Sequence, residues 1–311
     1  MIKKISKAFK NPRLAASVVW EACSKMIKSD KLYLKVYYYL HTGKRLNLDN
    51  PVSFNEKMQW LKLHNTKPVC TQMADKYAVR QLITDSIGED YLIPLLGVWD
   101  CFDEIDFGLL PDKFVLKATH DSGSFVICKD KSRFDKNAAR KKLNRSLKNN
   151  YFWAGREYPY KDIKPRIIAE TYMENPGEDG LSDYKFFCFG GKPDMLFYAS
   201  DRFNNDDGEG AKYDYYDMNL NHLPIRNQGH KNKNLVIPHT AQFEEMKDLA
   251  AKLSKGFPFL RVDFYLINGK VYFGELTFHD GGGVVPFVPD EWDYRLGEKI
   301  VLDGYNNNSA R

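Results

Sequence analysis

Residues 260–277 read LRVDFYLINGKVYFGELT, two alternating runs on either side of Asn268-Gly269. Asn-Gly between such runs is a strong signal for a β-hairpin with a two-residue turn. That turn places Asp263 opposite Gly274. Glu275 then lies one position off, so only a register shift or a bulge brings both carboxylates to one face. The sequence alone leaves this register open.

The charged residues of this hairpin have the character of a metal and phosphate site. Two carboxylates on adjacent strands suit a hard divalent cation, which takes oxygen ligands and is completed by phosphates and water. Arg261, two residues before Asp263, suits a phosphoryl group whose charge develops during transfer. An exposed hairpin that merely carries charge would have the same pattern. The interpretation therefore depends on phosphate-binding residues elsewhere in the chain.

A second group of residues has the pattern of a phosphate-binding loop. Residues 113–118 predict a strand that contains Lys117, and a lysine inside an apolar strand needs an anionic partner. The turn at 120–124 supplies backbone amides and hydroxyls for phosphates, before a second strand at 125–128. Lys76 is predicted to open a helix and adds another cation. Residues 170–173 end a buried strand, which is a suitable adenine-binding hinge.

The rest of the chain predicts a mixture of helices and hairpins. Ser53 and Glu56 form a capping box that begins a helix through Leu63. Residues 201–235 are rich in Asn, Asp, Gly and Tyr and predict a long loop, a candidate lid. Periodicity and turn residues predict one or two helices within 14–40, helices at 73–87, 134–150 and 243–254, and strands at 167–173, 183–189 and 195–198.

Composition favours a globular protein in the cytoplasm. No apolar run in the 311 residues approaches the roughly 18–20 residues that span a bilayer, and no signal peptide follows the basic first residues. The five cysteines are scattered without metal-ligand spacing, which indicates reduced thiols.

Positive charge is concentrated in the first 45 residues. They hold eleven Lys and Arg but only Glu21 and Asp30 as acids, whereas the whole chain has a net charge of +5. A solvated helix face explains this arm as well as contact with an anionic surface does, such as the inner membrane leaflet or a lipid-linked sugar phosphate. No nucleic-acid-binding module accompanies the arm, so we expect no nucleic-acid partner.

In this order along the chain, the residues resemble the ATP-grasp superfamily. Residues 114–124 look like its lysine strand and phosphate loop, Asp75-Lys76 like its earlier phosphate-binding lysine, and 168–173 like its hinge. The resemblance implies ATP and Mg²⁺ as cofactors. The nucleotide-binding residues that it implies are Lys76, Lys117, His120, Ser122, Gly123, Ser124, Glu170, Thr171, Tyr172, Met173 and Asp183, and the catalytic ones are Arg261 and Lys117.

The metal ligands that the resemblance implies are Asp263, Glu275 and Thr277. Thr277 stands where the family usually has asparagine, which leaves Thr277, Asp280 or water as the third ligand.

A closer resemblance is to the TupA-like ATP-grasp proteins of bacterial polysaccharide gene clusters. It extends over about residues 45–300 and is carried by SFNEKMQWLK at 53–62, ADKYAVR at 74–80, YLIPLLGVW at 91–99, DYKFFCF at 183–189 and GELTF at 274–278, with three glycines at 281–283. It implies amide-bond formation between an amino acid or other amine and a uronic acid of a surface polysaccharide or its precursor.

Candidate substrate residues are Asp201, Arg202, His279, Gly281, Gly282 and Gly283. The glycines form either a flexible turn or a loop whose bare backbone approaches an acyl phosphate. Asp201 and Arg202 form either an acceptor contact or a surface ion pair. His279 and His120 are interpreted as local hydrogen-bonding groups rather than general bases.

The expected fold is α+β, an ATP-grasp fold with nucleotide between two sheet-bearing lobes, preceded by a helical N-terminal region. The expected boundaries are 1–70 for that basic region and 71–311 for the ATP-grasp region, in which 112–175 holds the lysine strand, loop and hinge and 176–311 the metal and substrate residues. Two other functions stay open: a glycosyltransferase of the same pathway, and a non-catalytic nucleotide-binding scaffold.

Overall fold

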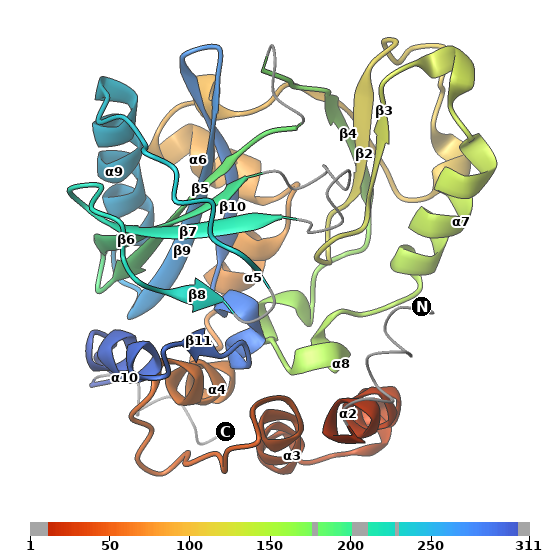
Figure 1. Ribbon diagram of the computed structural model, residues 1–311. Coiled ribbons are helices and arrows are strands. Elements are labelled where there is room, and N and C mark those ends of the chain that lie inside the picture. Colours follow the sequence, from red (N-terminus) through yellow and green to blue (C-terminus); the bar gives the residue numbers. More distant parts are fainter. Residues whose placement is uncertain (1–11, 176–179, 201–210, 228–229, 304–311) are drawn as a thin grey trace.

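The computed structural model describes residues 12–175, 180–200, 211–227 and 230–303. Within them, two antiparallel sheets lie next to each other, with helices against their outer faces (Figure 1). The first has the strand order β1-β4-β2-β3, with bounds Leu95–Trp99, Ile167–Thr171, Phe114–Ala118 and Phe125–Cys128. The second has the order β10-β9-β5-β6-β7, with bounds Lys270–Thr277, Phe259–Ile267, Asp183–Phe189, Lys192–Ser200 and Lys212–Asp217. The expected α+β class is confirmed.

The helices cover the sheets and form a base beneath them (Figure 1). They are α2 (Pro12–Ala22), α3 (Asp30–Thr42), α4 (Phe54–His64), α5 (Pro68–Ala74), α6 (Val79–Ser86), α7 (Lys136–Leu147), α8 (Phe152–Gly155), α9 (Ala241–Ser254) and α10 (Glu291–Glu298). Short elements are the 3₁₀ turns η1 (Ser24–Met26), η2 (Glu89–Tyr91), η3 (Phe102–Glu104), η4 (Lys131–Arg133), η5 (Tyr158–Tyr160) and η6 (Asp280–Gly283), and the strand pair β8 (Arg226–Asn227) and β11 (Phe287–Val288).

The N-terminal helices begin and end at capping residues. The Ser29 hydroxyl accepts from the amide of Leu32 at the start of α3, and Gly43 ends that helix with φ of 77°. The predicted capping box of Ser53 and Glu56 is present at the start of α4. None of the described helices is long and apolar enough to cross a membrane. All five cysteines are free thiols.

Three apolar cores hold the layers together. Sheet β1-β4-β2-β3 packs against α7 through residues such as Phe114 and Leu143. The other sheet is buried on both faces. Successive residues of β5 point to opposite sides of the sheet, so this strand contributes to two cores. Phe186 packs toward α9, and Phe187 packs toward α3 and α4. The base helices are thus fixed to the sheet that carries the carboxylate hairpin.

The structure corrects two predictions of local structure. The predicted helix at 73–87 is interrupted, because the Asp75 carboxylate accepts from the amide of Tyr77 at 2.9 Å and from Arg166 at 3.1 Å. Lys76 therefore lies in a turn between α5 and α6 rather than opening a helix.

The predicted long loop at 201–235 is wrong over 212–217, where β7 pairs with β6 and buries Tyr215 and Tyr216. These tyrosines supply the apolar faces of a strand in a segment that also contains three charged residues. Asp201 and Arg202 lie outside the described residues.

Candidate active site

The hairpin of β9 and β10 brings the two predicted metal carboxylates together. Its Asn268-Gly269 turn closes as the sequence predicts. Pairing then shifts next to Gly274, and Glu275 lies opposite Asp263. A Cβ on Gly274 would lie 2.9 Å from the carbonyl oxygen of Asp263, so this bulge requires glycine. The register shift that the sequence left open is present.

Arg261 is the centre of the carboxylate cluster. Its guanidinium donates to both oxygens of Asp263 at 2.7 Å, and to Asp280 and Glu275 at 2.6 Å each. Burial alone would lower the pKa of Arg261, but the three carboxylates raise it well above its ordinary value. The predicted catalytic arginine and metal carboxylates therefore form one buried network.

Lys185 completes this network from the neighbouring strand. It lies opposite Asp263 in the β5–β9 pairing and donates to Asp263 and, at 3.2 Å, to Asp183. Only 9% of its side chain is exposed. The sequence analysis did not propose Lys185 as a site residue, although a lysine within the apolar strand of 183–189 is the same signal that singled out Lys117.

Lys117 has the anionic partner that its strand position demands. Its ammonium lies 2.6 Å from the carboxylate of Glu170 on the adjacent strand β4. The other oxygen of Glu170 accepts from Arg80 at 3.0 Å, and Arg80 also donates to the carbonyl of Ile93. The sequence did not predict Arg80 as a site residue, and the structure places it beside Lys117 and Glu170.

Lys76 links the phosphate loop to the carboxylate cluster. Its ammonium donates to the carbonyl of Asp121, and its amide donates to the carbonyl of Thr119 at 3.2 Å. Burial lowers the pKa of Lys76, against the opposing field of Glu275, and the charge of Lys117 lowers it further. Lys76 thus lies within electrostatic reach of the hairpin carboxylate Glu275 and of Lys117.

The predicted loop and hinge residues differ in how their side chains are used. Ser122 and Gly123 are exposed at the loop tip, where Gly123 has φ of 89°. His120 is buried, and its Nε2 hydrogen-bonds with the carbonyl of Ser146 on α7. At the hinge, Thr171 donates its amide to the carbonyl of Pro94 at 3.0 Å.

Tyr172 and Met173 follow β4, and both are half-buried. The lysine ammonium groups of Lys113 and Lys129 lie 5.8 Å from the centre of the Tyr172 ring. The carbonyl of Ser124 accepts from the amide of Ala118 at 2.9 Å, and this bond closes the loop onto β2. Among the described residues, the side chain of Ser124 makes no hydrogen bond with Tyr172 or Met173.

The three-glycine loop is held by α4 of the N-terminal region. Gly281, Gly282 and Gly283 all have positive φ, between 55° and 63°. The buried Gln59 donates to the carbonyls of Gly282 and Gly283 at 3.0 and 2.7 Å, and Lys62 donates to that of Gly282 at 2.8 Å. The carbonyls of the glycine loop are thus bonded to side chains of α4, while the approach of its backbone to an acyl phosphate stays a prediction.

His279 lies beside the glycine loop in a buried charged group. Its Nδ1 is 3.3 Å from the carboxylate of Glu157. Burial lowers the pKa of His279, although Glu157 opposes this, and burial also lowers the pKa of Lys62 to about 8. Glu157 and Lys62 carried no sequence signal for a site, because their contacts join segments far apart in the chain.

The donor set fits a magnesium nucleotide. Asp263 and Glu275 offer carboxylate oxygens on adjacent strands, with Thr277 3.3 Å from Glu275 through its hydroxyl. Lys76 offers positive charge near Glu275, and Lys117 lies near Lys76. Among the described residues, no group of three or more His, Cys, Asp or Glu side chains is arranged to hold a metal. A magnesium ion at this site would take two carboxylate ligands from the protein and its other ligands from phosphate oxygens and water.

A family profile described as TupA-like ATPgrasp matches residues 56–301. The chain belongs to the TupA-like ATP-grasp family. The match covers the carboxylate hairpin, the lysine strand, the phosphate loop and the glycine loop, and it confirms the ATP-grasp fold expected from the sequence.

Solved structures similar to this TupA-like protein include ATP-grasp ligases. D-alanine–D-alanine ligase from Bacillus anthracis complexed with ATP is 15% identical over 74% of this chain and 60% of its own, with a TM-score of 0.39. The corresponding ligase from Helicobacter pylori is 14% identical over 81% of this chain and 70% of its own, with a TM-score of 0.40. A D-cycloserine synthetase is 15% identical over 76% of this chain and 73% of its own, at 0.40. None of the curated proteins matches the chain.

Proposed function

We propose that this TupA-like protein is an ADP-forming carboxylate–amine ligase. In this proposal it joins an amino acid or other amine to a uronic acid of a bacterial surface polysaccharide or its precursor. The boundaries that we propose are 71–311 for the ATP-grasp region and 1–70 for a basic, helical N-terminal region, of which the structure describes residues 12–70. The chain spans 60% of the length of the Bacillus anthracis ligase, so the whole activity is proposed from the site of this chain itself.

One observation carries the proposal. Asp263 and Glu275 lie opposite each other around Arg261, within the electrostatic reach of Lys76 beside the phosphate loop. Oxygen ligands, an arginine and two lysines are the groups that phosphoryl transfer from a nucleotide requires, because its catalysis is mainly positioning and charge stabilisation.

The chemistry divides into two steps. An oxygen of the substrate carboxylate attacks the γ-phosphorus of ATP, the bond to the β-phosphate oxygen breaks, and ADP leaves with its electron pair. The amine then attacks the acyl phosphate carbon, loses a proton and expels phosphate to leave the amide. Asp263, Glu275 and Thr277 would hold magnesium, which neutralises phosphate charge. Lys76 and Lys117 bind the phosphates, and Arg261 stabilises the transferring group.

The remaining predicted residues have supporting roles in the proposal. The amides of residues 120–124 close over the phosphates, residues 171–173 hold adenine through their backbone, and Asp183 is the acidic ribose contact that the resemblance implies. The glycine loop presents bare backbone to the acyl phosphate. A dry pocket is required, because water would hydrolyse this intermediate.

Titration calorimetry with a non-hydrolysable ATP analogue and magnesium tests the proposal. We expect magnesium-dependent binding that Lys117→Ala weakens at least tenfold, about 1.4 kcal/mol. Lys299→Ala is the control, since Lys299 pairs with Asp194 on the surface and belongs to no part of the proposed nucleotide site. Its binding should stay within twofold of the unmodified protein. Folded protein that binds a nucleotide sugar but no ATP analogue would instead indicate the glycosyltransferase.

A second measurement separates the ligase from a scaffold. ADP release in the presence of amines and uronic acid sugars should be abolished by Glu275→Gln. Binding of ATP without any ADP release, unaffected by Glu275→Gln, would indicate a non-catalytic nucleotide-binding protein. We further propose that the protein works in the cytoplasm, with its basic N-terminal region against the inner membrane or a lipid-linked sugar. Residues 1–11 of that region lie outside the described residues.

A further inference from the structure

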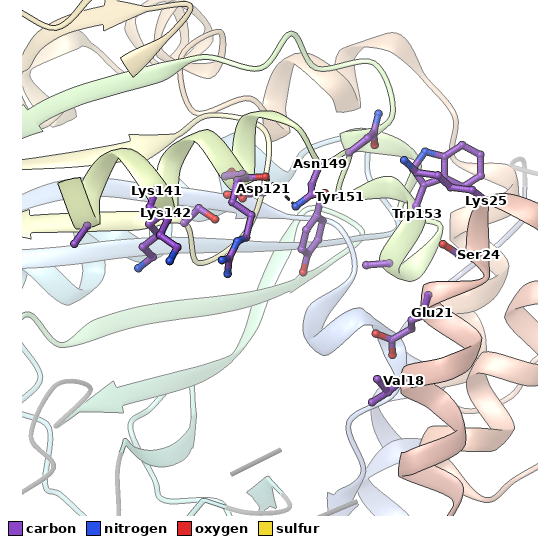
Figure 2. A pocket seen from close by; sticks show the side chains of 17 residues that line it. Val18, Glu21, Ser24, Lys25, Asp121, Lys141, Lys142, Asn149, Tyr151 and Trp153 are labelled. Carbon is purple, nitrogen blue, oxygen red and sulfur yellow. Dashed lines mark hydrogen bonds between the residues drawn. The ribbon is translucent and has the colours of Figure 1, made fainter. Parts of the chain in front are cut away.

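A hollow of about 870 Å³ lies between α2, α7 and α8, beside the phosphate loop (Figure 2). This volume is within the roughly 300–1,000 Å³ of small-molecule sites. We call it the basic hollow, after the cationic residues in its wall, which are Lys25 of η1 and Lys141, Lys142 and Arg145 of α7. Asp121 and Ser124 of the phosphate loop also line it, so it adjoins the proposed nucleotide site.

Among the described residues, the basic hollow is lined by more positive than negative side chains, four cations against two carboxylates. Two carboxylates line it, and both have partners: Glu21 lies 3.3 Å from His41, and Asp121 accepts from the hydroxyl of Ser146. Within the described part of the chain, Lys25, Lys141 and Arg145 form no ion pair with a carboxylate.

The other side of α7 is arranged differently. Arg140 lies 2.8 Å from the carboxylate of Asp103, and the ammonium of Lys136 lies over the ring of Phe107 at 4.7 Å. Lys141 and Arg145, one helical turn apart on the hollow side, repel each other instead. An uncompensated cluster contributed by two separate elements is the arrangement expected where an anionic ligand supplies the missing charge.

The basic hollow leads toward the reacting groups past Tyr151. This residue lines the hollow, and Ser122 of the phosphate loop lies near its hydroxyl. Its ring packs against Tyr160 at 4.8 Å, and Tyr160 lies within the fields of Glu275 and Arg261. A ligand with its charge in the hollow therefore extends along an aromatic wall toward the carboxylate cluster. Trp153 also lines the hollow, on the side of Lys25 (Figure 2).

We infer that the basic hollow binds the diphosphate group of the acceptor substrate, so that the uronic acid is modified while it is attached to a diphosphate carrier. The inference rests on the proposed ligase function. Cations on two sides suit a group with several negative charges, whereas a lone carboxylate needs one partner. The aromatic wall suits the apolar face of a sugar ring beyond the diphosphate. A nucleoside diphosphate and a lipid diphosphate share this chemistry.

Calorimetric titration with UDP and with farnesyl diphosphate tests the inference. The protein is first saturated with magnesium and the ATP analogue, so that the nucleotide site is occupied. We expect a diphosphate to bind, and Lys141→Gln/Arg145→Gln to weaken that binding at least tenfold. Tighter binding of UDP indicates a nucleotide carrier, and tighter binding of farnesyl diphosphate indicates a lipid carrier.

Lys136→Gln/Lys148→Gln is the matched control, because it removes the same charge from the same helix outside the basic hollow. Its affinity for the diphosphate should change less than twofold. Lys25→Gln, on a separate element, should weaken binding even if the double variant of α7 does not fold. Equal weakening by the hollow and control variants, or no binding of either diphosphate, overturns the inference.

The two proposals fail separately in this design. If the ATP analogue binds normally but no diphosphate binds, only the inference about the basic hollow is overturned. Diphosphate binding that depends on Lys141 and Arg145 in a protein that binds no ATP analogue overturns the ligase, while the hollow remains a diphosphate site.

Discussion

Arg261 neutralises the carboxylates around it and also keeps Glu275 ionised. It neutralises the buried Asp263 and Asp280 and the partly exposed Glu275, which would otherwise repel one another. Burial alone would raise the pKa of Glu275, but Arg261, Lys185 and Lys76 lower it to about 2. Because 44% of that side chain is exposed, solvent screens these fields. Glu275 is therefore ionised and open to a cation on one side.

His279 provides a pH-dependent test of the buried charges beside the glycine loop. Its pKa is lowered from the ordinary 6.5, so the unfolded chain binds the proton first as pH falls. The folded state therefore loses stability from about pH 6.5 downward. His279→Gln should reduce this slope of unfolding free energy by up to about 1.4 kcal/mol per pH unit, the effect of one proton.

Urea denaturation between pH 5 and 7 measures the slope. His239→Gln is the control, because His239 is exposed and contacts Glu244 on the surface, so its slope should match that of the unmodified protein. A slope that His279→Gln leaves unchanged would contradict the assignment of a neutral buried imidazole.

At the scale of elements, the hairpin bulge is the feature on which the carboxylate pair depends. Gly274→Ala places a Cβ 2.9 Å from the carbonyl of Asp263, and the strand has to shift to relieve the contact. We expect a loss of about 1–3 kcal/mol in unfolding free energy, the usual cost of overpacking. Magnesium-dependent binding of the ATP analogue should also weaken at least tenfold, since Glu275 leaves its place opposite Asp263.

Gly155→Ala is the matched control for this prediction. An added Cβ there meets its nearest atom, on Glu157, at an ordinary 3.5 Å, and Gly155 has no positive φ. Gly155→Ala should keep both stability and binding. Gly274→Ala that binds the analogue as tightly as the unmodified protein would show that the bulge does not position the metal ligands.

The bulge also shows which part of the hairpin could be predicted from the sequence and which could not. Asn268-Gly269 specifies the hairpin locally, but the register beyond it depends on contacts between Gly274 and the facing strand. The strand at 212–217 was missed for a similar reason, because its tyrosines are buried by the facing strand β6 and by core residues elsewhere in the chain. The break at Asp75 requires Arg166, which is distant in sequence.

Site residues could be predicted where a lysine within an apolar strand required an anionic partner. Lys117 was found in this way, and the same reasoning applied to 183–189 finds Lys185. Glu157, Lys62 and Gln59 were not predictable, because their roles come from the packing of α4 against the glycine loop. Their polarity alone is typical of a solvated helix face.

At the scale of the whole molecule, the N-terminal helices are part of the site architecture. The helix α4 fixes the glycine loop, and α2 with η1 forms one wall of the basic hollow. The buried Arg156 joins η1 and α3 to α8. It donates to the carbonyls of Ser24 and Ile27 at 2.7 and 2.9 Å, and its Nε lies 2.9 Å from the carboxylate of Asp30.

Arg156→Met should loosen the N-terminal helices without affecting the nucleotide site. Two hydrogen bonds to a charged donor are lost, and their carbonyls are left partly buried, so we expect about 2–4 kcal/mol less stability. Hydrogen exchange should quicken in α2, η1 and α3. Binding of the ATP analogue should change less than twofold, because Lys76, Lys117 and the hairpin contact other elements, while diphosphate binding should weaken with the wall of the hollow.

Arg140→Met is the control, since Arg140 makes an exposed ion pair with Asp103, and such pairs contribute about 0–1 kcal/mol. It removes the same charge and leaves α2 and α3 untouched. Unchanged hydrogen exchange in Arg156→Met would mean that the apolar contacts of Trp20 and Tyr33 alone hold these helices in place. Equal loss of nucleotide and diphosphate binding would mean instead that the N-terminal helices and the ATP-grasp region unfold as one cooperative unit.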